Sequence, residues 1–175
     1  MNWGHYLFSF SGRINRAKAW LFVIIAVVFE MVAFTVIAVA FGLEHIANVI
    51  QNKEPPTVLS GNVVALILCM IVGLAFLVLV FSAFAVVVKR LHDRNKSAWW
   101  LVVFYLIPIV LNGYRISTVV NAIHRGEMMY ACNPAATLAG GIAALISLWA
   151  FVEIYCLSGT NGDNRYGPDP LAGRR

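Results

Sequence analysis

Charged residues are scarce in this chain: Asp, Glu, Lys and Arg make up 12% of its 175 residues, whereas hydrophobic residues make up 61%. A soluble domain normally has about 25% charged residues. So apolar a composition excludes an ordinary soluble protein, because so short a chain cannot hide that much apolar surface in a core. The chain therefore belongs to the membrane class.

Cysteine is scarce as well. Its three residues show neither a CxxC pair nor a Cys/His ligand spacing, which excludes a disulfide framework and a zinc site. Cys69 and Cys156 lie in apolar runs as packing residues, and Cys132 lies in a polar loop as a free thiol. We assign no catalytic, cofactor-binding or metal-binding residue, and we expect no enzymatic activity.

Positive charge is present without the pattern of a nucleic-acid-binding protein. The pI is about 9.4, yet no basic stripe alternates with exposed aromatic residues. Ten of the thirteen Lys and Arg residues instead lie in three short segments, at 13–18, 89–96 and 165–175. Beside apolar runs, anionic lipid headgroups are the simpler partner for such charges.

Four apolar runs predict four transmembrane helices at about 19–43, 62–88, 98–114 and 135–157, since a span needs about 20 residues. The third is short: residues 98–111 rise about 21 Å against an apolar thickness of about 30 Å. Polar residues 112–115 are expected to complete this crossing by reaching the headgroups. Residues 112–125 then form either a surface helix or an extension of the third span.

The positive segments fix the predicted topology, because Lys and Arg are retained on the cytoplasmic side. Four spans place both termini and the 89–96 loop in the cytoplasm, whereas three spans would export the tail with its Arg residues. The predicted fold is thus an all-α polytopic membrane protein, a single domain over 1–175. Apolar residues at 3, 6, 7 and 10 add a short interfacial amino-terminal helix. Small residues at 136, 140 and 144 would let another helix, such as one of a second copy, approach closely.

Three polar segments carry the most distinctive patterns: FSGRINR at 10–16, KRLHDR at 89–94 followed by SAWW at 97–100, and GTNGDNRYGPDP at 159–170. The Gly and Pro content of the last predicts a series of turns. In this order the segments resemble the bacterial domain-of-unknown-function 805 family (DUF805) of YhaH-like inner-membrane proteins, whose pattern is F-x-G-R-x-x-R, then R-L-H-D with S-G-W-W, then G-x-N-R-Y-G-x-D-P.

The resemblance spans nearly the whole chain and implies a small multi-pass protein of the bacterial inner membrane, with no established activity or substrate. The chain departs from the pattern at three residues: Asn95 and Ala98 stand where the family usually has Gly, and Ala19 replaces a usual aromatic residue. Residues 112–134 look like an insertion relative to shorter members, so this outer loop is where the protein is expected to be specialised.

We expect the three segments to meet on the cytoplasmic side, with Asp93 pairing with Arg13 or Arg165. Under a functional interpretation the arginines bind lipid phosphate or another anion. Under a structural one they enforce topology and pair with acidic residues, and His92 bonds a backbone carbonyl or a headgroup. The candidate cluster comprises Gly12, Arg13, Arg16, Arg90, His92, Asp93, Trp99, Trp100, Asn164, Arg165, Tyr166 and Gly167.

Glu30 is a candidate polar site within the membrane, because it lies near the middle of the first span, where a charge costs at least about 2.5 kcal/mol. It is expected to face the bundle interior, where it either binds a cation or relays protons, or hydrogen-bonds Ser82 or Ser147. The favoured function is a non-enzymatic membrane protein whose cytoplasmic cluster binds lipid headgroups or a partner protein. The alternative is a small transporter or channel subunit built around Glu30, and an enzyme using His92 and Asp93 comes third.

Overall fold

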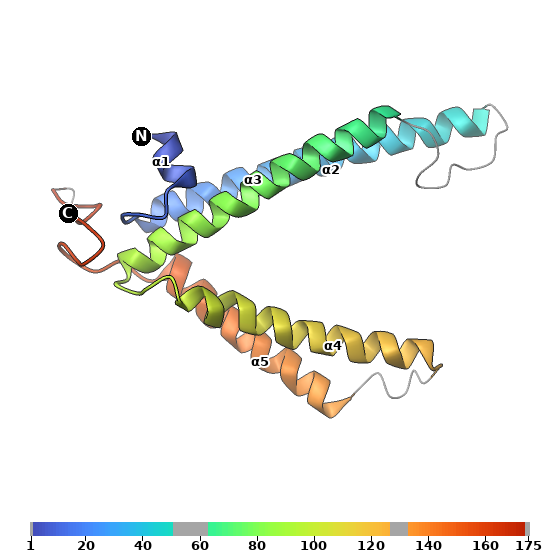
Figure 1. The fold of residues 1–175 in the computed structure, drawn as a ribbon. Coiled ribbons are helices and arrows are strands. Elements are labelled where there is room, and N and C mark those ends of the chain that lie inside the picture. Colours follow the sequence, from blue (N-terminus) through green and yellow to red (C-terminus); the bar gives the residue numbers. More distant parts are fainter. Residues whose placement is uncertain (1, 51–62, 127–132, 174–175) are drawn as a thin grey trace. The chain divides into compact units, whose positions relative to one another are not determined.

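The computed structural model of the chain describes residues 2–50, 63–126 and 133–173. The described residues form helices joined by turns, and the predicted all-α membrane fold is confirmed (Figure 1). Four helices are long and apolar enough to cross a membrane: Arg16–Gly42, Leu66–Asp93, Val102–His124 and Pro134–Cys156. The chain divides into two compact units, which we describe separately: Met1–Ser9 with Trp20–Ala85, and Phe10–Ala19 with Val86–Arg175.

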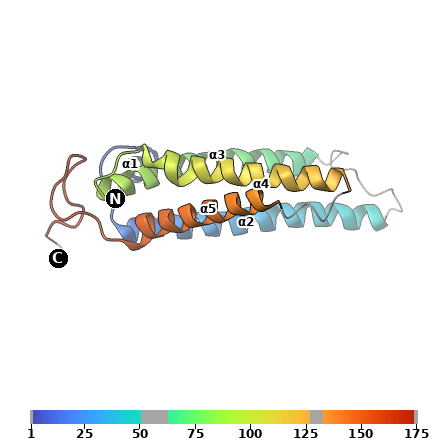
Figure 2. The same cartoon turned by 90° about the horizontal axis from the view of Figure 1, so that it is seen from below.

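The first unit contains α1 (Trp3–Phe8) and most of two long helices, α2 (Arg16–Ile50) and α3 (Val63–Asp93), which run in opposite directions beside each other (Figures 1 and 2). The predicted amino-terminal helix is present, but it ends at Phe8, before the last predicted apolar position at residue 10. Asn2 caps it by accepting a hydrogen bond from the His5 amide, at 3.2 Å. Burial raises the pKa of Tyr6 to about 12, against a smaller lowering by a hydrogen bond to the Phe22 backbone.

The second unit is built on a helical hairpin. A π-helical turn, η1 (Val102–Leu106), leads into α4 (Ile107–His124), and α5 (Pro134–Phe151) returns and ends in a second π-helical turn, η3 (Val152–Cys156). Its core is formed by Val87, Leu91, Phe104, Ala150 and Ile154. These side chains come from α3, η1, α5 and η3, so the carboxyl-terminal end of α3 is packed against the hairpin.

The helix α4 settles the two alternatives for residues 112–125, because it continues without interruption to His124. The segment therefore extends the third span instead of forming a surface helix. Pro108 lies in the first turn of α4, where its missing N–H is tolerated. Residues 127–132 of the predicted outer-loop insertion lie outside the described part of the chain.

Small residues line the face of α5 that packs on α4. Ala136, Ala139, Gly140 and Ala143 are all buried there. Two members of the small-residue ridge, Ala136 and Gly140, thus pack within the chain, whereas Ala144 is exposed. The homo-oligomer that this ridge suggested stays a prediction.

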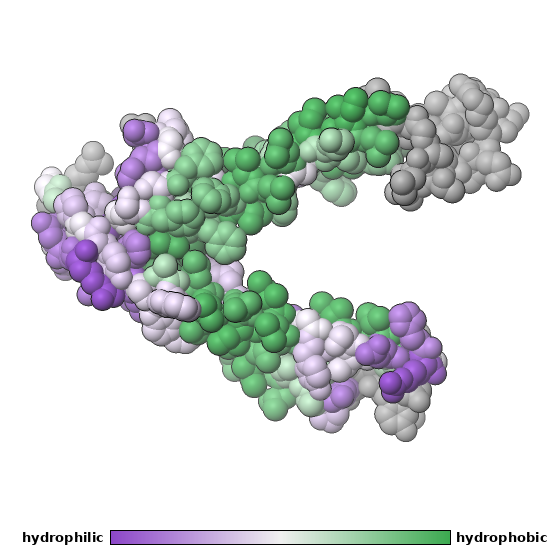
Figure 3. Space-filling model, viewed as in Figure 1, coloured by the Kyte–Doolittle hydropathy of each residue, from purple (hydrophilic) through white to green (hydrophobic). Residues whose placement is uncertain are grey.

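Large apolar side chains cover the outside of the long helices (Figure 3). Phe34 is 75% exposed, Met70 74% and Leu145 69%. Water would disfavour so large and continuous an apolar surface, so these faces suit contact with lipid. Polar residues are concentrated toward the helix ends (Figure 3).

Candidate functional site

Arg13 is the centre of the cluster that the sequence predicted. Its side chain is 1% exposed, and its guanidinium has five N–H groups to satisfy. Nε donates to Asp93 Oδ1 at 3.1 Å, Nη1 to the carbonyls of Gly162 (2.7 Å) and Gly167 (3.2 Å), and Nη2 to the carbonyl (2.7 Å) and hydroxyl (3.3 Å) of Thr160. Every donor of Arg13 is therefore used inside the protein.

Asp93, the last residue of α3, joins two buried arginines. It accepts from Arg13, as predicted, and also from Nη1 of Arg90 one helical turn earlier. The backbone carbonyl of Asp93 in turn accepts from the amide (2.9 Å) and the hydroxyl (3.1 Å) of Thr160. A buried carboxylate with two guanidinium partners is compensated in charge and in hydrogen bonds, which is the condition for burying it at all.

The arginines also cap the carboxyl-terminal end of the fourth span. Arg90 donates to the carbonyls of Ile154 (2.7 Å from Nε) and Leu157, Arg16 to that of Cys156 (2.8 Å), and Arg94 to that of Ser158. The last carbonyls of a helix have no partner within the helix and carry partial negative charge. Cationic side chains from two other parts of the chain supply the missing donors.

A second carboxylate balances the outer part of the cluster. Glu153 on η3 accepts from Arg94 Nε and Lys96 Nζ, each at 3.0 Å. The ammonium of Lys96 lies 4.3 Å above the centre of the Trp100 ring, within cation–π range. The predicted residue Trp100 therefore belongs to the cluster. Trp99, in contrast, is 80% exposed, and its side chain makes no described hydrogen bond or ring contact.

The predicted turns of the tail are present and held by side chains. The amide of Gly162 donates to Asp169 Oδ2, and the amide of Asp169 donates to Asp163 Oδ1, each at 3.0 Å. Asn164 and Gly167 exchange backbone hydrogen bonds, and Gly167 has a φ of 136° that favours glycine. These turns place the Gly162 and Gly167 carbonyls against Arg13.

His92 lies flat on Tyr166 of the tail, with ring centroids 3.9 Å apart and planes 5° apart. It is hydrogen-bonded to the backbone of Gly12, as expected for a structural histidine. Its Nδ1 atom is buried without a hydrogen-bond partner among the described residues. Arg165 donates to the Asn95 carbonyl at 3.2 Å and lies over the Tyr166 ring at 4.7 Å, so it does not pair with Asp93.

The contacts or backbone conformations of three further residues explain why these residues occur in the motif segments. Asn164 Nδ2 bonds the carbonyl of His92 at 3.0 Å and so ties the tail to the end of α3. Gly12 has a φ of 87°, and Asn95 has a φ of 56°. Asn is one of the few other residues that adopt this left-handed region, which explains its presence where the resembling family has Gly.

Gly159 lies in the third polar segment but was not among the predicted cluster residues. A Cβ atom at this position would lie 2.0 Å from Oδ2 of Asp93, so only glycine allows the tail to pass the carboxylate. Thr160 and Glu153 were not assigned to the cluster either. No spacing signal identified them, because they act across 59 to 147 residues of sequence and much of the contact is to backbone carbonyls.

Glu30 is placed by the structure on α2 in the first unit, where it is exposed. No hydrogen bond or ion pair joins its carboxylate to another described residue, and the suggested bonds to Ser82 and Ser147 are not among the described ones. Its expected place in a bundle interior and its role in transport stay predictions.

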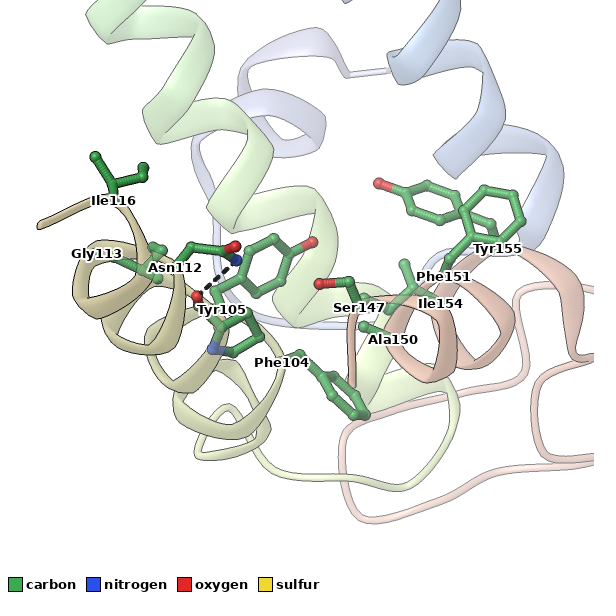
Figure 4. A pocket seen from close by; sticks show the side chains of 12 residues that line it. Phe104, Tyr105, Asn112, Gly113, Ile116, Ser147, Ala150, Phe151, Ile154 and Tyr155 are labelled. Atoms are coloured by element: carbon green, nitrogen blue, oxygen red, sulfur yellow. Dashed lines mark hydrogen bonds between the residues drawn. The ribbon is translucent and has the colours of Figure 1, made fainter. Parts of the chain in front are cut away.

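A pocket of about 590 Å³ opens in the second unit beside the two π-helical turns (Figure 4). Phe104 and Tyr105 of η1 and Ile154 and Tyr155 of η3 line it, together with Asn112, whose amide donates to the Pro108 carbonyl at 2.9 Å. The lining is mostly apolar, and all of it lies within the spans. No motif residue of the cluster contributes to this pocket.

Most polar groups of the cluster are paired in hydrogen bonds and ion pairs, whereas His92 Nδ1 and some N–H groups of Arg16 and Arg165 have no described partner. The cluster contains six cations (Arg13, Arg16, Arg90, Arg94, Lys96 and Arg165) and two carboxylates in ion pairs, Asp93 and Glu153, and the carbonyl end of the fourth span offsets part of the excess positive charge. Its two most buried arginines have their donors engaged, whereas Arg16 and Arg165 are exposed.

Comparisons with known proteins agree with this architecture. The chain is 28% identical over 163 residues to inner membrane protein YhaH of Escherichia coli (strain K12), covering 93% of this chain and 87% of that protein. It is 27% identical over 164 residues to the uncharacterised protein YiiR of the same strain, covering 94% and 87%. No solved structure matches it. The model of the DUF805 family, described as a protein of unknown function, matches residues 7–168, so the chain is a membrane protein that belongs to this family.

Proposed function

We propose that this is a non-enzymatic protein of the bacterial inner membrane whose arginine cluster (Arg13, Arg16, Arg90, Asp93, Arg94, Lys96, Glu153 and the tail 159–169) lies on the cytoplasmic side and binds anionic lipid headgroups. The name of the relative YhaH and the four apolar helices support the membrane. The positive-inside rule supports the cytoplasmic side, since Arg16, Arg94 and Arg165, one from each basic segment, lie at one end of the second unit.

One observation supports headgroup binding: some arginines of the cluster are buried and hydrogen-bonded within the protein, whereas others are exposed and have unused donors. Every guanidinium nitrogen of Arg13 and Arg90 donates to a protein acceptor, and these bonds hold the tail in place. Arg16 uses only Nη1 in a described hydrogen bond, and Arg165 only Nη2. Both are exposed beside the ends of spans, where anionic headgroups attract Lys and Arg by about 1 kcal/mol each.

The test uses the full-length protein purified in a mild detergent and titrated with phosphatidylglycerol or zwitterionic phosphatidylethanolamine, with bound lipids counted by native mass spectrometry. We expect the wild type to prefer phosphatidylglycerol and the double variant Arg16→Gln/Arg165→Gln to lose that preference. A carboxyl-terminal green fluorescent protein, which fluoresces in the cytoplasm, tests the side of the membrane.

The matched control is Arg125→Gln, because Arg125 is also an exposed arginine but caps the opposite end of α4. It should leave the preference for phosphatidylglycerol unchanged. An unchanged preference in the double variant, with its melting temperature intact, would reject headgroup binding by the cluster and favour a protein partner at the same surface.

A further inference from the structure

Arg115 lies on the face of α4 that packs against α5. Pro108 and Ala122, seven residues before and after it, are both buried, and residues seven apart share one face of a helix. Arg115 thus occupies the middle of an apolar helix seam within the span Val102–His124. The sequence had placed it at the outer headgroups, because the third span was expected to be shorter.

The seam makes room for this side chain at Gly140. A Cβ atom at Gly140 would lie 2.9 Å from Cδ of Arg115 and 3.1 Å from its Nη1. Ala136, Ala139 and Ala143 are the buried neighbours on α5, and their side chains are also short. The small residues of α5 therefore let the arginine stem cross the helix, with its guanidinium resting against the helix backbone.

The guanidinium has no counter-charge in the described part of the chain. Arg115 is exposed, and none of its N–H groups forms a hydrogen bond or ion pair with a described residue. The carboxylates of Asp93 and Glu153 are engaged by other cations at the opposite end of the unit. A charge within a span is costly unless it finds an ionic partner or reaches the interface.

The depth of Arg115 within the span limits which anion can be its partner. Gly140 lies six residues after Pro134, where α5 begins, which corresponds to about 9 Å along the helix. From its position beside Gly140, the long arginine side chain can shorten this distance by extending toward the headgroups while its stem stays in the apolar region. The anion present there in every phospholipid is the phosphate, whose oxygens match the fork of a guanidinium.

We propose that Arg115, cradled by Gly140, binds the phosphate of a phospholipid in the leaflet at the Pro134 end of α5. The site lies at the opposite end of the unit from the arginine cluster and is independent of it. It also differs in chemistry: the cluster is expected to select net negative charge, whereas Arg115 recognises the phosphate and accepts zwitterionic phospholipids as well.

The test compares phosphatidylethanolamine with a diacylglycerol of the same acyl chains, using native mass spectrometry of the full-length protein in detergent. We expect Arg115→Gln to weaken binding of phosphatidylethanolamine about fivefold, the factor that corresponds to the loss of one exposed ion pair. Diacylglycerol should bind weakly to both proteins. Inorganic phosphate should not compete, because the acyl chains contribute to binding; competition would identify free phosphate as the ligand and overturn the proposal.

A pair of glycine variants tests the cradle without changing any charge. Gly140→Ala displaces the Arg115 stem and should reduce the affinity as Arg115→Gln does, whereas Gly141→Ala has nothing within 4 Å of its new Cβ and should not. Arg115→Lys keeps the charge, and it should retain part of the affinity and a normal melting temperature. Equal phosphatidylethanolamine affinity in wild type, Arg115→Gln and Gly140→Ala would overturn the proposal, as would equal binding of diacylglycerol.

Discussion

The two ends of the second unit use arginine in opposite ways. At the cluster, Arg13 is 1% exposed and gives all five N–H groups to protein oxygens. At the other end, Arg115 is exposed and gives none to a described residue. We therefore expect the number of satisfied donors, and not the presence of arginine, to separate a structural position from a binding position. In the proposals above, guanidinium groups whose donors are used by the protein fix the chain, and those with unused donors attract an external anion.

The largest effect is expected from Asp93→Ala, which tests the structural role of the arginine cluster. It leaves Arg13 and Arg90 as buried cations without their carboxylate, and removal of one partner from a buried ion pair costs about 3–5 kcal/mol. We expect a loss of this size in the free energy of unfolding, measured by circular dichroism during titration with a denaturing detergent. Asp163→Ala, which removes an exposed carboxylate from the tail, should cost far less. Similar losses in the two variants would contradict a central role for Asp93.

A somewhat smaller effect is expected from Gly159→Ala. The new methyl group would overlap the Asp93 carboxylate, and overpacking of this kind costs about 1–3 kcal/mol. The tail 159–169 should move away from Arg13 and become sensitive to limited proteolysis in the detergent-solubilised protein. Gly113→Ala, at a glycine with open space around it, is the matched control and should be cut at the wild-type rate. A protected tail in Gly159→Ala would show that the contact is dispensable.

The smallest effect is expected at Asn95, whose φ of 56° is unfavourable for residues with a side chain. Asn95→Gly should change the free energy of unfolding by less than about 1 kcal/mol in the stabilising direction, and Asn95→Ala should destabilise by about 1 kcal/mol. The melting temperatures of the wild type, Asn95→Gly and Asn95→Ala, measured under the same conditions, give the order of their stabilities. A stabilised Asn95→Ala variant would mean that the turn has another conformation in the membrane.

Sequence reasoning reached the features that depend on local patterns. The apolar runs and the spacing of Trp3, Tyr6 and Leu7 were sufficient for the spans and the amino-terminal helix, because helix periodicity is visible in a single segment. The Arg13–Asp93 pair was also predictable, since a buried charge needs an opposite one. Arg165 was the wrong alternative because its side chain instead bonds the Asn95 carbonyl.

The features that were missed depend on tertiary packing. Backbone acceptors, such as the carbonyls of Gly162 and Gly167, can be supplied by any residue type, so the amino-acid sequence does not identify them. The polar residues after Leu111 resemble a loop in hydropathy, yet they continue α4 because its other face packs along the alanines of α5. That extension moved Arg115 from the expected interface into the span.

Arg13 also has a consequence for biosynthesis. Its acceptor Gly167 lies 154 residues later in the chain, so the amino-terminal segment cannot complete its hydrogen bonds until almost the entire protein has been made. At ribosomal rates of about 5–20 residues per second, this interval is roughly 8–30 s. During that time the guanidinium of Arg13 has water as its hydrogen-bond partner. A chain that ends before Thr160 lacks four of the five acceptors of Arg13, so it cannot bury this arginine as the finished protein does.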